Sequence, residues 1–230
     1  MNELFQESIF FGVLLSMLSY GLGVVLRKKW NKAFLNPLLI AVTACILFLT
    51  AFHIDYAVYE QGAKYLSYFL TPATVCLAIP LYEQLTVLKQ NWKAVFLGIF
   101  SGVLTSLCTI LALSCLFGLN HKEYVTLLPK SITTAIGMGV TEELGGYVTI
   151  CVAVIILTGI WGNIIAETLC RLLHIHHPIA KGIAIGSSAH AIGTARAMEM
   201  GVIEGAMSSL SIAVAGILTV IAAPFFALFL

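Results

Sequence analysis

Long stretches without a charged side chain constrain this chain more than any other feature of its sequence. Six runs of at least 18 residues contain no Asp, Glu, Lys or Arg, and they cover residues 8–26, 33–52, 65–82, 94–120, 144–166 and 205–230. A helix of about 20 apolar residues crosses roughly 30 Å of hydrocarbon. The runs therefore predict an all-α polytopic membrane protein with six or more transmembrane helices.

The composition excludes two broad classes of protein. Charged residues make up only 10% of the chain, whereas an average soluble domain has about 25%. The 12 Lys and Arg residues nearly balance the 11 Asp and Glu residues, so the basic surface of a nucleic-acid-binding protein is missing. We therefore expect the lipid bilayer as the environment and no nucleic acid as a partner.

We predict one integral membrane domain over residues 1–230. It would comprise a peripheral first helix within 1–30, a first half over 34–117 and a second half over 124–230 that carries the broken helices. The six cysteines lie in or beside apolar segments without C-x-x-C spacing, which is typical of buried thiols rather than of disulfides or metal ligands. We expect no metal and no cofactor.

The positive charges predict the orientation of the helices. Arg27, Lys28, Lys29 and Lys32 follow the first run without an intervening acid, which by the positive-inside rule places this loop in the cytoplasm. A full crossing by residues 124–143 would then carry the basic segment Arg171–Lys181 outside. A re-entrant or broken element keeps that segment inside, and a full crossing is the alternative.

A first Gly-rich polar element lies over residues 128–146, LPKSITTAIGMGVTEELGG. Charged groups inside a membrane tend to face a pathway or a partner, and irregular backbone is tolerated there only when it is buried or lines a cavity. The alternative is that its lysine reaches the interface and its hydroxyls bond their own helix. The residues that we predict to bind a substrate here are Lys130, Ser131, Thr133 and Thr134.

A second such element covers residues 177–201, HPIAKGIAIGSSAHAIGTARAMEMG. Ser187, His190 and Thr194 share one face of a helix, and a break at Gly193 would turn Arg196 toward the same cavity. The alternatives are a packing role for His190 and an Arg196–Glu199 ion pair at i,i+3. The residues that we predict to bind a substrate here are Ser187, Ser188, His190, Gly193, Thr194 and Arg196.

Other residues are predicted to shape or gate the helices: Pro72, Pro80, Gly137, Gly145, Gly146, Glu199 and Glu204. The two prolines interrupt the run 65–82, so this segment is predicted to be discontinuous, with a simple kinked helix as the alternative. Short similarities between residues 69–85 and 128–146 indicate an internal inverted repeat of the kind found in transporters. Chance similarity between apolar segments is the alternative.

Together, the two elements bring cations, hydroxyls and helix ends toward the middle of the membrane, which predicts a site for a small carboxylate. The chain has no G-x-S-x-G elbow and no H-E-x-x-H motif, and no Asp lies near His190 in the sequence. We therefore predict no catalytic residue and a carrier rather than an enzyme.

The chain resembles the LrgB/CidB family of bacterial membrane proteins, which is related to the plastid glycolate/glycerate translocator of plants. The matching segments are NPLLIA (36–41), TPATVCLAIPLYEQ (71–84), LPKSITTAIGMGV and EELGG (within 128–146), HPIAKGIAIG (177–186), HAIGTARAMEMG (190–201) and EGAMSSL (204–210). One departure is Ala189, where the family often has Ser.

The resemblance implies a multi-pass protein of the bacterial cytoplasmic (inner) membrane that works with a small LrgA/CidA-type membrane protein, and we also expect a homo-oligomer. It implies two functions, which stay open here. One is transport of C2–C3 carboxylates such as pyruvate, glycolate or glycerate. The other is holin- or antiholin-like control of murein hydrolase export and cell lysis.

Overall fold

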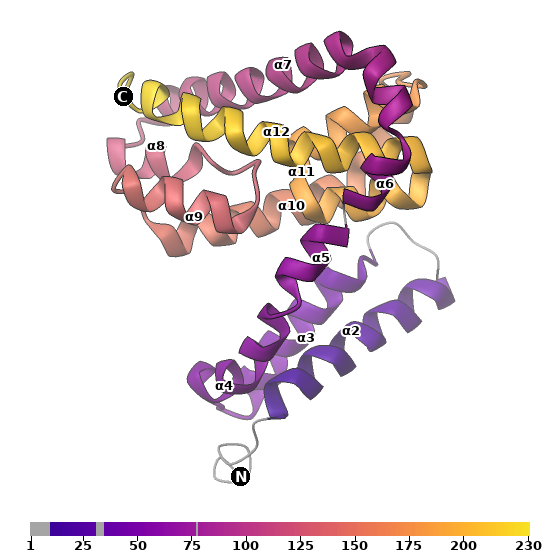
Figure 1. Ribbon diagram of the computed structural model, residues 1–230. Helices are drawn as coiled ribbons and strands as arrows, with labels where there is room; N and C mark the ends of the chain where they lie inside the picture. Colours follow the sequence, from indigo (N-terminus) through magenta and orange to yellow (C-terminus); the bar gives the residue numbers. More distant parts are fainter. Residues whose placement is uncertain (1–9, 31–34, 77) are drawn as a thin grey trace. The chain divides into compact units, whose positions relative to one another are not determined.

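The computed structural model describes residues 10–30, 35–76 and 78–230, and the regular structure in these ranges is helical (Figure 1). The chain divides into two compact units, residues 1–76 and 77–230, which we describe separately. The predicted single membrane domain with halves at 34–117 and 124–230 stays a prediction. Lys32 and the first nine residues of the predicted 1–30 helix lie outside the described residues.

In the first unit, helix α2 packs against both α3 and α4. Its helices are α2 (Phe11–Trp30), α3 (Pro37–Ala51), α4 (Tyr56–Ser67) and α5 (Leu70–Cys76). Helix α3 begins where the sequence offers a cap, because the Asn36 side chain accepts a hydrogen bond from the Leu38 amide at 2.8 Å and Pro37 has a φ suited to the first turn. At Gly12 a Cβ atom would lie 2.1 Å from the Tyr59 carbonyl oxygen, so α2 and α4 touch backbone to backbone.

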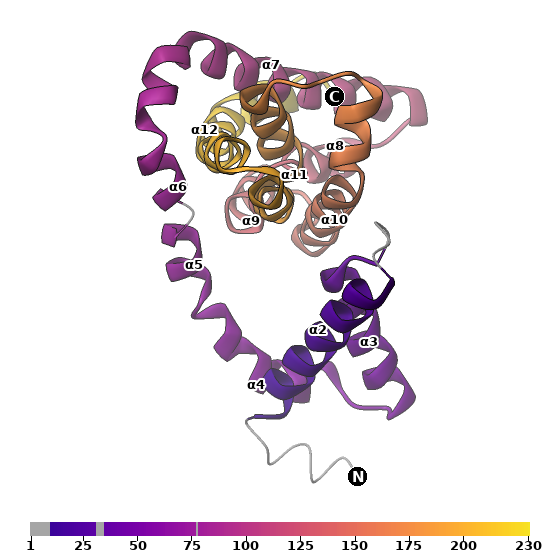
Figure 2. The ribbon, with the colours of Figure 1, turned by 90° about the vertical axis from the view of Figure 1, so that its right-hand side faces the viewer.

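The second unit is built around α11, which packs against α12, α10 and α7 (Figure 2). Its helices are α6 (Ala78–Glu83), α7 (Leu85–Phe117), α8 (His121–Leu127), α9 (Thr134–Glu143), α10 (Val148–Leu172), α11 (Pro178–Met200) and α12 (Val202–Ala227). Its core contains Ile99, Leu107, Tyr124 and Met207, each at most 1% exposed. Burial of such side chains is the main favourable contribution to the packing of this unit.

Four of the six uncharged runs form helices long and apolar enough to cross a membrane: α2, α7, α10 and α12. Six or more spans are not confirmed among the described residues. Helix α3 has 15 residues, which reach only about 22 Å. The run 65–82 is not one helix, because α4 ends at Ser67, a turn follows, and α5 begins at Leu70 with Pro72 in its first turn. Pro80 lies within α6, and residue 77 lies outside the described residues.

The segment 124–143, which overlaps the first Gly-rich element, is also discontinuous, because it contains the end of α8, the connection 128–133 and α9. Helix α8 starts at a capping box in which Asn120 and Glu123 each bind the other's backbone amide at 2.9 Å. Helix α9 ends just before Gly145, whose φ of 75° is left-handed and favours glycine. Whether this element is re-entrant in the bilayer stays a prediction.

The second Gly-rich element, α11, is broken at His190. This residue has φ 42° and ψ −139°, values that cost strain in a residue with a side chain. The break lies three residues before Gly193, so the position proposed from the sequence is corrected. The reason is packing: the imidazole of His190 lies against Gly159 of α10, where a Cβ atom would be 2.7 Å from the ring.

Candidate functional site

A polar pocket of about 370 Å³ lies between α7, α11 and the turn that precedes α9. Seven of its ten lining residues carry a hydroxyl group, one is a lysine, and none is acidic. The lining residues are Ser101, Gly102, Thr105, Ser106, Thr109, Lys130, Ser131, Ala184, Ser187 and Ser188. The pocket therefore combines one positive charge with many neutral hydrogen-bonding groups.

Lys130 supplies the charge. Its Nζ donates a hydrogen bond to the Ser131 hydroxyl at 3.0 Å, and that hydroxyl lies 3.1 Å from the Ser106 hydroxyl on α7. Ser131 is buried and Lys130 is half-buried. In residues 10–30, 35–76 and 78–230 no carboxylate pairs with Lys130. A partly buried ammonium without a counter-ion is costly, and a bound anion would remove that cost.

The hydroxyls of α7 are functional candidates that the sequence reasoning missed. Ser101, Thr105 and Thr109 follow each other at intervals of four residues, which places them on one face of a helix. That periodicity is the signal that could have identified them inside a run otherwise interpreted only as a transmembrane helix. Gly102 lets α11 come close, because a Cβ atom there would lie 2.8 Å from the Ser187 hydroxyl.

The two serines of α11 that line the pocket also bond their own helix. Ser187 donates to the Ile183 carbonyl at 2.8 Å, and Ser188 donates to the Ala184 carbonyl at 2.6 Å. Each hydroxyl oxygen still has lone pairs and can rotate toward a ligand.

A second pocket of about 380 Å³ follows the same contact between α7 and α11. It reaches His177, the residue before the first turn of α11, and it shares Ala184 with the polar pocket. Asn91 and Gly98 of α7 form part of its other wall. The two cavities thus lie next to each other along the contact between α7 and α11, which we call the α7–α11 seam.

His190 does not line the polar pocket. It is 2% exposed, and its Nε2 lies 3.0 Å from the Ile155 carbonyl oxygen on α10. Thr194 donates to the His190 carbonyl at 2.9 Å and lies 2.7 Å from the Ser208 hydroxyl of α12. The structure places both residues in the packing between α10, α11 and α12, which is the alternative considered for His190.

Arg196 also lies outside the pocket. Its guanidinium binds Glu199 at 2.5 Å and the carboxylate of Glu167 on α10. Glu167 in turn binds Arg171 at 3.1 Å. The Glu199 ion pair was the structural alternative for Arg196, whereas the contact with Glu167 was not foreseen because 29 residues separate the two in the chain.

The remaining predicted residues lie at helix ends and contacts. Thr133 precedes the first turn of α9 and Thr134 begins that helix, and neither they nor Gly193 line the polar pocket. A Cβ atom at Gly137 would meet Ile155 at 2.4 Å, and one at Gly146 would meet the Thr126 hydroxyl at 2.8 Å. Glu204 lies in the first turn of α12. Their proposed binding and gating roles stay predictions.

Of the ten predicted substrate-binding residues, four meet at one pocket. They are Lys130, Ser131, Ser187 and Ser188. The structure thus separates the two cations that the sequence reasoning had placed at a common site, with Lys130 in the polar pocket and Arg196 in an ion-pair network between α10 and α11.

Known proteins are similar to this chain over almost its whole length. The LrgB-like family matches residues 16–229. Proteins named Antiholin-like protein LrgB from Bacillus cereus (strain B4264) and Bacillus anthracis (strain CDC 684) are each 34% identical over 218 residues, which is 94% of this chain and 95% of theirs. No solved structure matches the chain. Given this extent, and the four apolar helices of membrane-spanning length among the residues that the structure describes, the chain is a multi-pass membrane protein that belongs to the LrgB-like family.

Proposed function

We propose that this chain is an antiholin-like protein of the bacterial cytoplasmic membrane. The observation that supports this is the 34% identity, over 94% of the chain, to proteins named Antiholin-like protein LrgB. In this role it would act with a small LrgA/CidA-type membrane protein, as a homo-oligomer, in the control of murein hydrolase export and cell lysis.

We further propose a molecular activity for the same protein: passage of small organic anions, of the C2–C3 carboxylate class, through the polar pocket. One observation carries this proposal, namely that the Lys130 ammonium faces hydroxyls and is paired with no carboxylate in the described part of the chain. A volume of about 370 Å³ suits a small ligand, and charge-assisted hydrogen bonds are the strongest that a carboxylate can receive here.

The neighbouring pocket supports a route to this site. Because it adjoins the polar pocket at Ala184 and extends to His177, an anion could move along the seam between α7 and α11. Small residues keep this seam narrow, since a Cβ atom at Gly98 would lie 3.3 Å from Ile183. Movement along it therefore requires only small separations of the two helices.

Uptake into proteoliposomes tests the transport proposal. The purified protein, with its LrgA/CidA-type partner if needed, should accumulate labelled pyruvate, glycolate or glycerate above empty liposomes, and Lys130→Gln should abolish this uptake. Lys122→Gln is the matched control, because that ammonium lies over the Tyr147 ring at 4.3 Å, outside the pocket. Equal uptake by wild type and Lys130→Gln would contradict the proposal.

A lysis assay separates the two functions. Cells that depend on this protein for normal lysis control would be complemented with wild type or with Lys130→Gln. If lysis control follows from anion passage, the variant fails in both assays. If the variant restores lysis control but not uptake, antiholin-like control does not depend on this pocket. Release of large dyes from the liposomes would instead indicate a hole and contradict a selective pathway.

A further inference from the structure

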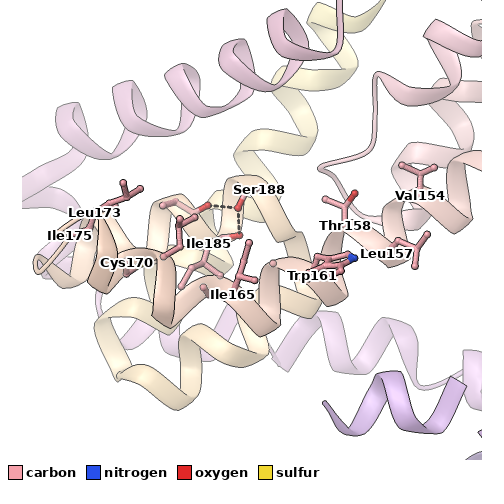
Figure 3. Close-up of a pocket in the computed structure, with 14 residues that line it drawn as sticks. Val154, Leu157, Thr158, Trp161, Ile165, Cys170, Leu173, Ile175, Ile185 and Ser188 are labelled. Atoms are coloured by element: carbon pink, nitrogen blue, oxygen red, sulfur yellow. Dashed lines mark hydrogen bonds between the residues drawn. The ribbon is translucent and has the colours of Figure 1, made fainter. Parts of the chain in front are cut away.

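An apolar groove of about 620 Å³ runs along the contact between α10 and α11 (Figure 3). Helix α10 contributes Leu157, Trp161, Ile165 and Leu169, and α11 contributes Ile185 and Ser188. The side chain of Trp161 is 63% exposed in this unit. The Ser188 hydroxyl donates to its own helix, to the carbonyls of Ala184 and Ile185 at 2.6 and 3.4 Å, and most of the other lining side chains are apolar.

One end of the groove is basic. Its last lining residues, Leu173 and Ile175, belong to the turn that joins α10 to α11, and Arg171 and Lys181 flank that turn in the sequence. Arg171 follows directly after Cys170, which lines the groove, and Lys181 lies three residues before Ala184, which also lines it. The Arg171 side chain is 79% exposed, so its ion pair with Glu167 is weak and leaves donors free for another anion.

We propose that this groove is a binding site for an anionic phospholipid. One acyl chain would lie against α10 between Leu157 and Leu173, and the phosphate would be bound by Arg171 and Lys181. The two features belong together because α10 is long and apolar enough to cross a membrane. Hydrocarbon would then surround its middle, and cations at its end would lie where headgroups begin. Basic ends of intramembrane grooves on the cytoplasmic side recognise acidic headgroups, and the positive charges predict that side for this turn.

The groove and the polar pocket share a wall. Ala184 and Ser188, which lie one turn apart on α11, line both cavities. A lipid in the groove would thus support the helix segment that forms one face of the polar pocket. The lipid site itself is independent of the proposed transport, and its test measures binding alone.

Trp161 provides a direct test, because it lies in the groove and only Trp30 and Trp92 need to be removed to isolate its fluorescence. The Trp30→Phe/Trp92→Phe protein would be placed in phosphatidylcholine vesicles that contain a fixed fraction of either phosphatidylglycerol or phosphatidylcholine with brominated acyl chains. Brominated phosphatidylglycerol should quench Trp161 more strongly. From the attraction of each cation near a membrane surface we expect a preference of about fivefold per cation.

The charge variants decide between specific and general lipid contact. Arg171→Gln/Lys181→Gln should make the two brominated lipids equivalent. Lys89→Gln/Lys93→Gln, which removes two exposed lysines on α7, should keep the preference. Circular dichroism confirms that each variant is folded. The proposal is overturned if both lipids quench Trp161 equally, if the preference survives loss of Arg171 and Lys181, or if neither lipid quenches, since protein would then cover the groove.

Discussion

The guanidinium group of Arg196 on α11 binds the carboxylate of Glu167 on α10, and the same guanidinium binds Glu199 one turn further along α11. Only 23% of the Arg196 side chain is exposed, so this cation depends on both carboxylates. The pair with Glu167 links α10 to α11 beyond the kink at His190, as does the hydrogen bond that Asn163 donates to the Ile192 carbonyl at 2.7 Å. Arg196 thus has a role in helix packing that needs no ligand.

We predict that Glu167→Gln lowers the stability of the detergent-solubilised protein by about 1–2 kcal/mol, because the half-buried guanidinium keeps only Glu199 as an ionic partner. Thermal unfolding measures this change. Arg171→Gln serves as the control, since it removes the exposed partner of Glu167 and should cost less than about 1 kcal/mol. Equal losses of stability in the two variants would show that the contact between Glu167 and Arg196 does not stabilise the protein more than the exposed ion pair does.

Gly159→Ala is predicted to destabilise the contact between α10 and α11 by about 1–3 kcal/mol. The added Cβ atom would meet the His190 ring at 2.7 Å and would displace the ring from the Ile155 carbonyl oxygen. Gly139→Ala is the matched control, because nothing lies within 4 Å of a Cβ atom there and alanine favours the helix. An unchanged melting temperature for Gly159→Ala would contradict the proposed packing of the ring.

Thr194→Val is predicted to cost about 1–3 kcal/mol, because the buried Ser208 hydroxyl loses the partner that lies 2.7 Å away. The double variant Thr194→Val/Ser208→Ala should recover part of this loss, since both polar groups are then absent. A double-mutant cycle on thermal stability gives the coupling between the two hydroxyls. Strictly additive effects would mean that the hydrogen bond contributes nothing measurable.

Thr105→Val is predicted to weaken anion uptake without unfolding the protein. Its hydroxyl lines the polar pocket, and loss of one hydrogen bond worth about 1 kcal/mol should raise the half-saturating anion concentration about fivefold. Thr86→Val, an exposed position near the start of α7, should leave that concentration unchanged. Uptake is measured over a series of anion concentrations in proteoliposomes. Identical uptake curves for the two variants would contradict the assignment of the Thr105 hydroxyl on α7 to the binding site.

The helices that match their predictions are those that a run of neighbouring uncharged residues specifies. Four helices that are long and apolar enough to cross a membrane, α2, α7, α10 and α12, each overlap one of the uncharged runs. The shortening of α3 to 15 residues was not visible in hydropathy alone, because the Asn36 cap sets the start of that helix within an uncharged run.

The candidate site, in contrast, depends on contacts between segments that lie far apart in the sequence. Lys130 and Ser131 were identified from an unusual composition, but their neighbour Ser106 comes from a helix that composition alone assigns to the lipid phase. Likewise the break in α11 lies at His190 rather than at the residue with the greatest conformational freedom, Gly193. Contacts with α10 decide the position of the break. These contacts cannot be predicted from the conformational preferences of the residues in α11.

The sequence by itself determined that this protein is helical and membrane-embedded, because the free energy of placing a segment in hydrocarbon is close to a sum over its own residues. Only the tertiary structure decided which charge is neutralised. Arg196 meets Glu167 across 29 residues of chain, while Lys130 meets the hydroxyl of Ser131, which in turn lies against the Ser106 hydroxyl of α7. The partner of a charge is chosen by helix packing, and packing depends on the shapes of whole faces rather than on any one segment.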